Sequence, residues 1–261
     1  MFKALNTAAT GMQAQQTNMD VIANNIANVN TTGFKKSRAE FEDLLYQTIK
    51  EPGAQTGLNA VSPTGVQTGL GVKTAAVQKN FEVGSAKVSN APLDIMIDGP
   101  GFFPVQTEDG QIAYTRDGSF KKDPNGRITD KNGRLLIPEI TIPPTTTGIQ
   151  VDPNGQVQVT VAGQQNPQTI GQIQIVNFIN PAGLKSIGKN LYMPSAASGQ
   201  PSQGAPGTAG MGQLSQGQLE ASNVNIVEEM VDMISAQRSY EMNSKAIQAA
   251  DQMLQSLNNL R

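Results

Sequence analysis

The stretch that decides the fold is at the amino end, where residues 5–29 read LNTAATGMQAQQTNMDVIANNIANV. Its apolar positions recur every seven residues, with a second series three residues later: Leu5, Met12, Met19 and Ile26, then Ala8, Gln15, Ile22 and Val29. Spacings of seven and three are typical of the seam of a coiled coil. The pattern predicts a helix over residues 1–32, which Gly33 stops.

The carboxyl end repeats this pattern. Its seam positions are Ile226, Met233, Tyr240, Ile247 and Leu254, and Ala236, Asn243, Ala250 and Leu257 follow three residues after the last four. Asn225 followed by Glu228 is typical of a helix start, because the asparagine side chain caps backbone N–H groups and the helix dipole favours an acid in the first turn. We expect a second helix within residues 223–261, paired with the first as a coiled coil.

The middle of the chain, residues 72–194, has the pattern of β structure. Apolar residues alternate with polar ones in residues 93–97, 156–161 and 172–176, which is the period of a half-buried strand. Dipeptides that favour tight turns separate these runs: Asp109-Gly110, Asp117-Gly118, Asn125-Gly126, Asn132-Gly133 and Asn154-Gly155. The fold class is therefore predicted as α+β, with a mostly antiparallel all-β domain between the two helices.

Two connecting segments complete the predicted organisation. Residues 33–71 form a connector, of which 46–71 is rich in glycine and proline and is either extended or a long hairpin. Residues 195–222 are rich in Ser, Gly, Pro and Ala and are expected to be a flexible or extended linker.

Composition excludes several classes of function. The 261 residues contain no His, Cys or Trp, which rules out a Ser-His-Asp triad, a cysteine nucleophile, an imidazole or thiolate zinc site and a disulfide. A net charge of −2 argues against nucleic-acid binding, and no apolar run is long enough to insert in a membrane. The amino end also lacks the pattern of a cleavable signal peptide. We predict no catalytic, metal or cofactor-binding residue, no cofactor and no enzymatic activity.

Single motifs that suggest chemistry have simpler explanations. Gly99-Pro100-Gly101 lacks the Lys and Ser/Thr of a phosphate loop, and Asp123 and Asp130 lie in turn sequences without the spacing of a calcium loop. The basic residues 35–38 precede acidic residues in 40–43, which indicates ion pairing within or between subunits. A carbohydrate-binding adhesin is disfavoured by 5% aromatic content, and a two-carboxylate hydrolase has no clustered carboxylates to support it.

The seams of both terminal helices are poor in large apolar side chains, and the first helix is also poor in charge. Residues 1–30 contain only Lys3 and Asp20 as charged side chains, although a solvated helix face normally carries more. One interpretation is that many copies pack side by side and cover the remaining Asn and Gln faces. The alternative, which periodicity alone favours, is a helical hairpin docked on the β region of the same molecule.

Several motifs resemble those of one family. Residues 24–35 (NNIANVNTTGFK) and 222–230 (SNVNIVEEM), followed by 237–241 and 243–245, resemble the terminal signatures of bacterial flagellar axial proteins, the rod, hook and hook-associated subunits. Residues 98–103 (DGPGFF) and 114–120 (YTRDGSF) resemble motifs of that family's β domain. The family-motif residues are Asn24, Asn25, Asn28, Thr32, Gly33, Phe34, Asn223, Asn225, Glu228, Arg238 and Tyr240.

Within this family, the length and residues 46–71 resemble distal rod subunits, with a proximal rod or hook-type subunit as the alternative. The resemblance implies a helical homopolymer: a rigid hollow tube across the periplasm, with the terminal helices inside, that transmits torque from motor to hook. It also implies type III export without a cleaved signal, and contacts with proximal rod subunits, hook subunits, envelope ring proteins and the rod or hook cap. Assembly would use the seam residues Leu5, Met12, Met19, Ile22, Ile26, Val29, Ile226, Met233, Tyr240, Ile247, Leu254 and Leu257.

Overall fold

The computed structural model describes residues 2–53, 55–57, 60–61, 63–163, 166–208 and 210–259. The chain forms two compact units, each built from segments that are distant in the sequence. Unit 1 consists of Met1–Ala27, Ser37–Gln78 and Asn225–Arg261, and unit 2 consists of Asn28–Lys36 and Lys79–Val224. Both helices belong to unit 1 and antiparallel strands dominate unit 2, which confirms the predicted α+β class.

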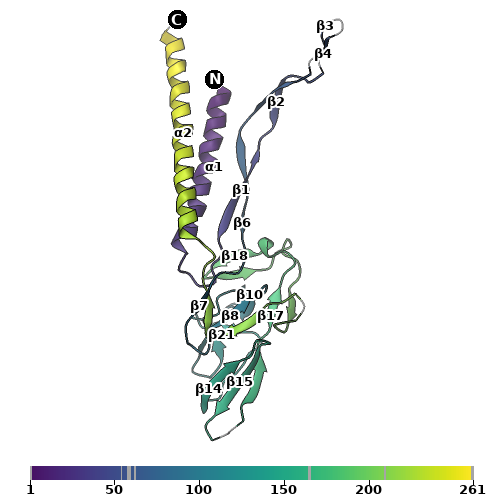
Figure 1. Cartoon of the computed structure of the whole chain (residues 1–261), viewed down its shortest axis with the longest axis vertical. Coiled ribbons are helices and arrows are strands. Elements are labelled where there is room, and N and C mark those ends of the chain that lie inside the picture. Colours follow the sequence, from purple (N-terminus) through teal and green to yellow (C-terminus); the bar gives the residue numbers. More distant parts are fainter. Residues whose placement is uncertain are drawn as a thin grey trace. The chain divides into compact units, whose positions relative to one another are not determined.

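In unit 1 the helices α1 (Phe2–Ala27) and α2 (Ile226–Asn259) pack side by side (Figure 1). The predicted cap of α2 is confirmed, because the Asn225 side-chain oxygen accepts a hydrogen bond from the Val227 N–H at 3.1 Å. Helix α1 ends at Ala27, earlier than the sequence predicts. The reason is a turn after the helix, in which the Thr31 N–H donates to the Asn28 carbonyl at 3.0 Å.

The rest of unit 1 is a narrow β ribbon (Figure 1). Strand β1 (Ser37–Asp43) pairs with β6 (Val72–Lys79), β2 (Tyr46–Lys50) with β5 (Val66–Gly69), and β3 (Gln55–Gly57) with β4 (Ala60–Val61). The β2–β5 and β3–β4 pairs are antiparallel. Where the structure describes it, segment 46–71 is therefore a long hairpin, one of the two conformations considered from the sequence.

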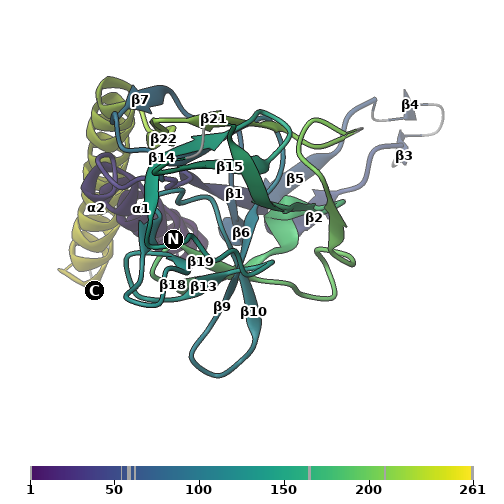
Figure 2. The same cartoon turned by 90° about the horizontal axis from the view of Figure 1, so that it is seen from below.

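Unit 2 is built on antiparallel sheets. Its largest sheet within the described residues has seven strands, in the order β11 (Lys121–Lys122), β12 (Ile128–Thr129), β13 (Leu135–Leu136), β9 (Phe103–Gln106), β10 (Ile112–Thr115), β19 (Leu191–Met193) and β18 (Lys185–Gly188). A second sheet contains β14 (Thr146–Val151), β15 (Gln156–Val161) and β16 (Gln168–Gln172). Figure 2 shows the loop between β9 and β10 projecting from the larger sheet.

Three further strand pairs of unit 2 involve the segment expected to be a linker. Strand β20 (Ser202–Gly204) pairs with β17 (Ile175–Asn177), β21 (Gln213–Gln216) with β8 (Ile95–Asp98), and β22 (Gln218–Glu220) with β7 (Ala86–Val88). Residues 195–222 are therefore not a free tether in this structure. Their composition conceals this, because backbone hydrogen bonds to distant strands and buried side chains such as Leu214 and Glu220 hold the segment.

Two apolar clusters form the core of unit 2. The first contains side chains from β8, β9, β15 and β17, including the fully buried Ile95, Phe103, Val157 and Ile175. The second is aromatic: the rings of Phe102, Phe178, Tyr114, Tyr192 and Phe81 meet edge to face with centroids 4.9 to 5.8 Å apart. Edge-to-face contacts of this kind add stabilisation beyond area burial.

Four of the five predicted glycine turns are confirmed. Gly110, Gly126, Gly133 and Gly155 have φ between 77° and 85°, as tight turns require. The prediction for Asp117-Gly118 is wrong, because Gly118 has no positive φ and is part of a close backbone crossing. Its carbonyl accepts the Ile95 N–H at 3.0 Å, and a Cβ atom at Gly118 would lie 1.7 Å from the Ile95 carbonyl oxygen.

Candidate assembly surfaces

The predicted seam residues of unit 1 are only partly covered by the pairing of α1 with α2. Ile22 is buried, and most of the others are half-buried: Leu5, Met12, Met19, Ile26, Met233, Ile247 and Leu254. Ile226 and Tyr240 are exposed. Val29 lies beyond the end of α1, in unit 2, and the side chain of Leu257 lies outside the described part of the chain.

Small side chains make the closest contact between the two helices. Ala8, Ala14, Ala236 and Ala250 are buried. At Gly11 a Cβ atom would lie 2.9 Å from the Asn243 side-chain nitrogen, so the α1 backbone closely approaches α2 there. Small residues bury little apolar area. Pairing within one chain therefore leaves much of the large apolar surface of both helices uncovered.

A second apolar stripe runs along α2. Val227, Val231 and Met242 are 60% to 70% exposed, and Met230 and Ile234 are about half exposed. At 3.6 residues per turn, Val231 and Ile234 lie roughly 150° around the helix from Ala236, on the side away from α1. Val231, Ile234 and Met242 of this stripe line a shallow hollow of about 550 Å³ together with Arg238. We call Val227, Met230, Val231, Ile234 and Met242 the outer stripe.

The sequence analysis missed the outer stripe. A seven-residue search selects one seam, whereas positions 227, 231, 234, 238 and 242 are spaced by three and four residues and form a second helical face. A search for two apolar faces on one helix would have found it. Contiguous apolar surface of this kind is uncommon on a monomer and typical of an interaction site.

The β ribbon of unit 1 also exposes large apolar side chains. Leu45 is 83% exposed, Tyr46 and Ile49 are more than half exposed, and Val66 is half exposed. These residues lie on β2, β5 and the link before β2. A ribbon with both faces in water does not retain such side chains for its own stability, so we regard the ribbon as a second candidate contact surface.

Asn25, one of the family-motif residues, joins three elements of unit 1. It is buried, its side-chain oxygen accepts the Ser37 N–H at 2.9 Å, and its side-chain nitrogen donates to the Ser37 carbonyl at 2.8 Å. The same nitrogen donates to the buried Glu229 carboxylate at 3.1 Å. Asn25 thus connects α1, the start of β1 and α2.

We predict that Asn25→Ala lowers the free energy of unfolding of unit 1 by about 2–3 kcal/mol. The change leaves the backbone groups of Ser37 and the carboxylate of Glu229 without a partner, and unpaired buried polar groups are costly. Hydrogen exchange at the Ser37 amide measures the effect. Asn6→Ala, at an exposed position of α1, is the control and should change stability by less than about 0.5 kcal/mol. Equal effects of the two substitutions would contradict the role of Asn25.

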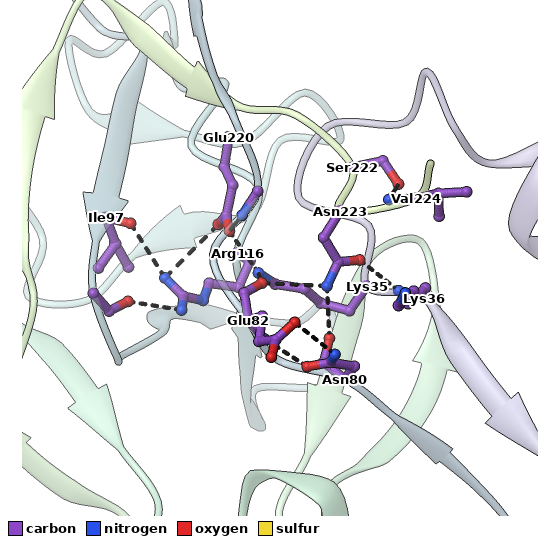
Figure 3. A network of polar contacts seen from close by, with 12 residues as sticks. Lys35, Lys36, Asn80, Glu82, Ile97, Arg116, Glu220, Ser222, Asn223 and Val224 are labelled. Carbon is purple, nitrogen blue, oxygen red and sulfur yellow. Dashed lines mark hydrogen bonds and ion pairs between the residues drawn. The ribbon is translucent and has the colours of Figure 1, made fainter. Parts of the chain in front are cut away.

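Unit 2 contains a buried ion cluster (Figure 3). Lys35, Arg116 and Glu220 are each at most 2% exposed. The Lys35 ammonium donates to a Glu220 carboxylate oxygen and to the Glu82 carbonyl, both at 2.5 Å. Arg116 donates to the Gly99 carbonyl at 2.8 Å, and its Nη1 lies 3.7 Å from the other Glu220 oxygen. Burial lowers the pKa of Lys35 and of Arg116, although the Glu220 charge opposes this shift.

The ion pairing expected around residues 35–43 is found only in part. Arg38 pairs with Glu40 at 2.9 Å, as the spacing suggests, and Glu42 pairs with Lys73 at 2.6 Å. Lys35 instead reaches Glu220, which is 185 residues further along the chain. No local pattern reveals such a partner.

Several other family-motif residues lie near this cluster, and the rest lie on or next to the helices. The Gly33 N–H donates to the Glu220 carbonyl at 2.8 Å, and the Asn223 side chain accepts the Lys36 N–H at 2.8 Å. The Phe34 ring is buried, with the Lys79 ammonium 5.0 Å from its centroid, and the Thr32 carbonyl accepts the Asn190 side chain. Asn28 lies in the turn after α1, and Glu228 and Arg238 are exposed on α2. Asn24 is likewise exposed, on α1.

The turns considered as calcium loops are closed by protein groups. The Asp123 carboxylate accepts the Asn125 and Arg127 N–H groups, both at 2.8 Å, and pairs with the Arg127 guanidinium at 2.9 Å. Over the described ranges, no group of three or more Asp or Glu side chains is placed to hold a metal ion. Neither α1 nor α2, over the lengths described, is apolar enough to span a bilayer.

Comparison with known proteins gives the class of this fold. Three family models match in chain order: the flagella basal body rod protein over residues 5–35, the flagellar hook protein FlgE/F/G D1 domain over 96–159, and the flagellar basal body rod FlgEFG protein C-terminal region over 215–260. Both ends and the middle of the chain thus match axial subunits of the bacterial flagellum, which confirms the resemblance seen in the sequence.

Individual relatives narrow the class. The flagellar basal-body rod protein FlgG of Caulobacter vibrioides is 51% identical, with 99% of both chains covered. Those of Borreliella burgdorferi and Bacillus subtilis are 51% and 40% identical, with at least 99% of each chain covered. The chain belongs to the FlgG family of flagellar basal-body rod proteins. The names of these relatives describe structural rod proteins and no enzymatic activity.

Proposed function

We propose that this protein is a structural subunit of the distal rod of the flagellar basal body, which polymerises helically into a rigid hollow shaft. The shaft transmits torque from the motor to the hook, and later subunits are exported through its channel. Membership of the FlgG family supports this proposal at the level of the basal-body rod. Of these properties, self-assembly is the one for which the exposed surfaces of the structure supply a physical argument.

The observation that carries the proposal is that α2 is apolar on two sides. One side packs on α1 through small residues, and the outer stripe remains exposed. Covering the outer stripe is worth roughly 1 kcal/mol for each half-exposed large side chain. We assign this role to a second copy of the chain, because a rod is made of many copies and every residue of the outer stripe is uncharged. In the polymer, we propose, the predicted seams of residues 1–32 and 223–261 complete coiled-coil packing.

The remaining organisation is part of the same proposal. Unit 2, with the paired strands of residues 195–222, acts as the β domain, and residues 37–78 act as the connector with its hairpin. The rod crosses the periplasm, and the subunit reaches it through type III export without a cleaved signal. At its ends and sides it contacts proximal rod subunits, hook subunits, the cap and the envelope rings.

The proposed function is tested by polymerising the purified chain with and without residues 46–71. We expect the full chain to form straight tubes and the shortened chain to form tubes that bend, because the ribbon loses its exposed apolar side chains as contacts between copies. Electron microscopy measures tube formation and curvature. A full-length variant with Tyr46→Ser and Ile49→Ser separates loss of these contacts from loss of length, and we expect it to bend as well.

Two results would count against the proposal. If the full chain stays monomeric at all concentrations up to the millimolar range, it is not a self-assembling rod subunit. If the shortened tubes are as straight as the full-length tubes, the ribbon does not stiffen the rod.

A further inference from the structure

Segment 28–36 is a short peptide inserted into unit 2 while the residues on both sides of it belong to unit 1. It fits tightly: Phe34 and Lys35 are buried, and Gly33 has a φ of 67°. A Cβ atom at Gly33 would lie 2.8 Å from backbone atoms of both Arg116 and Asp117. The segment therefore occupies a close-fitting site in unit 2.

The charges in this site are unequal. Two cations, Lys35 and Arg116, share one buried carboxylate, that of Glu220. The nearby Glu82 contributes its carbonyl to Lys35, while its own carboxylate is hydrogen-bonded by the Asn80 side chain at 2.8 Å. The other buried acid beside Arg116, Asp117, is paired with Lys131 at 2.7 Å. Glu220 is thus the one carboxylate in direct contact with both cations within the described residues.

The three charged residues come from different parts of the chain. Arg116 follows β10, and Glu220 ends β22, which is held in unit 2 by its pairing with β7. Without Lys35, Arg116 and Glu220 remain as a balanced pair. Without Glu220, Lys35 would enter a site in which a second cation is present and no carboxylate contacts the ammonium directly, and Arg116 already lowers the pKa of Lys35 in the complete cluster. Leaving a buried charge uncompensated is strongly unfavourable.

We propose that segment 28–36 docks on the rest of unit 2 last, after β22 has paired with β7 and placed Glu220 in the site. Docking of a motif near the amino end then depends on a residue near the carboxyl end. The order follows from the pairing of Lys35 with Glu220 and from the bonds of the Gly33 and Lys36 N–H groups to Glu220 and Asn223, and the substitutions below isolate the part due to charge. It does not depend on the chain forming a rod. It makes closure of unit 2 conditional on nearly the whole chain being present.

Pulsed hydrogen exchange during refolding of the full chain tests this order directly. The probes are the amides of Gly33 and Lys36 in the segment, and of Ala221, which donates to the Ser85 carbonyl at 2.9 Å and reports on the end of β22. We expect Ala221 to become protected at least threefold faster than Gly33 and Lys36. Protection of the segment at the same time as Ala221, or earlier, would overturn the proposal.

Substitutions test whether charge sets the order. In Glu220→Gln we expect amide exchange at Gly33 and Lys36 in the native state to rise at least tenfold. Adding Lys35→Met should return it to within about threefold of the wild-type rate, because the net charge of the cluster is then again one positive, carried by Arg116, which keeps its bond to the Gly99 carbonyl. The exposed controls Glu139→Gln and Lys121→Met should leave both amides unchanged.

The double variant also keeps the proposal testable if Glu220→Gln alone fails to fold. In that case, folding of the Lys35→Met/Glu220→Gln protein with the segment docked supports the proposal. A double variant that is as open as Glu220→Gln, or that also fails to fold, overturns it, because Lys35 is then not the charge that requires Glu220.

Discussion

Replacing Val231 and Ile234 together with Asp is expected to abolish polymerisation while the monomer still folds. Both side chains belong to the outer stripe and are about half or more exposed, so the monomer loses little packing. In a polymer the two new carboxylates would be buried against a neighbouring apolar surface. Burying an unpaired charge costs several kcal/mol for each contact, and each copy repeats that cost. Sedimentation and electron microscopy should detect no tubes at concentrations where the wild-type chain forms them.

The matched control is Gln237→Asp, an exposed position of α2 outside the outer stripe. It introduces one carboxylate on the same helix without placing it in the outer stripe, so it should leave polymerisation within about threefold of the wild-type critical concentration. Circular dichroism of the double variant checks that both helices persist as in the wild-type monomer. Normal tubes from the Val231→Asp/Ile234→Asp protein would show that the outer stripe is not an interface between copies.

The second large effect is expected at Gly118, where an alanine should destabilise unit 2 by at least about 4 kcal/mol. The added Cβ atom would lie 1.7 Å from the Ile95 carbonyl oxygen, which is far inside van der Waals contact. Relief requires β8 to move, yet Ile95 and Ile97 of β8 are fully buried in the main apolar cluster. Losses this large are exceptional for one methyl group and come from overpacking a rigid site. Urea unfolding followed by hydrogen exchange in β8 measures the loss.

Gly110→Ala is the control for this experiment. Gly110 has a φ of 77°, but no atom lies within 4 Å of the position of its Cβ. Its substitution therefore reports backbone strain alone, which costs about 1–2 kcal/mol. Gly118 has no positive φ, so its substitution reports steric overlap alone. Similar losses for the two variants would mean that the crossing of β8 with Gly118 is not rigid.

Local sequence patterns predicted the elements well where a single period or dipeptide sets the conformation. The heptads predicted both terminal helices, and Asn-Gly and Asp-Gly pairs predicted four turns with positive φ. The pattern failed at Asp117-Gly118 because the same dipeptide serves a different purpose there. A glycine can be required by a turn or by a neighbouring strand, and only the second requirement depends on residues distant in the sequence.

The candidate surfaces were predicted less completely than the elements. The heptad search missed the outer stripe, because it assumes one seam for each helix, and the seam residues that it selected stay a prediction. It also placed Val29 in a helix that ends before it. Residues 195–222 were expected to be a linker from their composition, yet β21 and β22 are held by pairing with β8 and β7.

The sequence by itself determined the two helices, the antiparallel character of the middle, most of the turns and the family, because these depend on spacings of a few residues or on contiguous motifs. Only the tertiary structure decided which face of α2 remains open, how Asn25 joins three elements, and that Lys35 pairs with Glu220. The physical reason is that burial and ion pairing are properties of groups that meet in space. Between Lys35 and its carboxylate lie 185 positions of chain, over which no periodicity carries information.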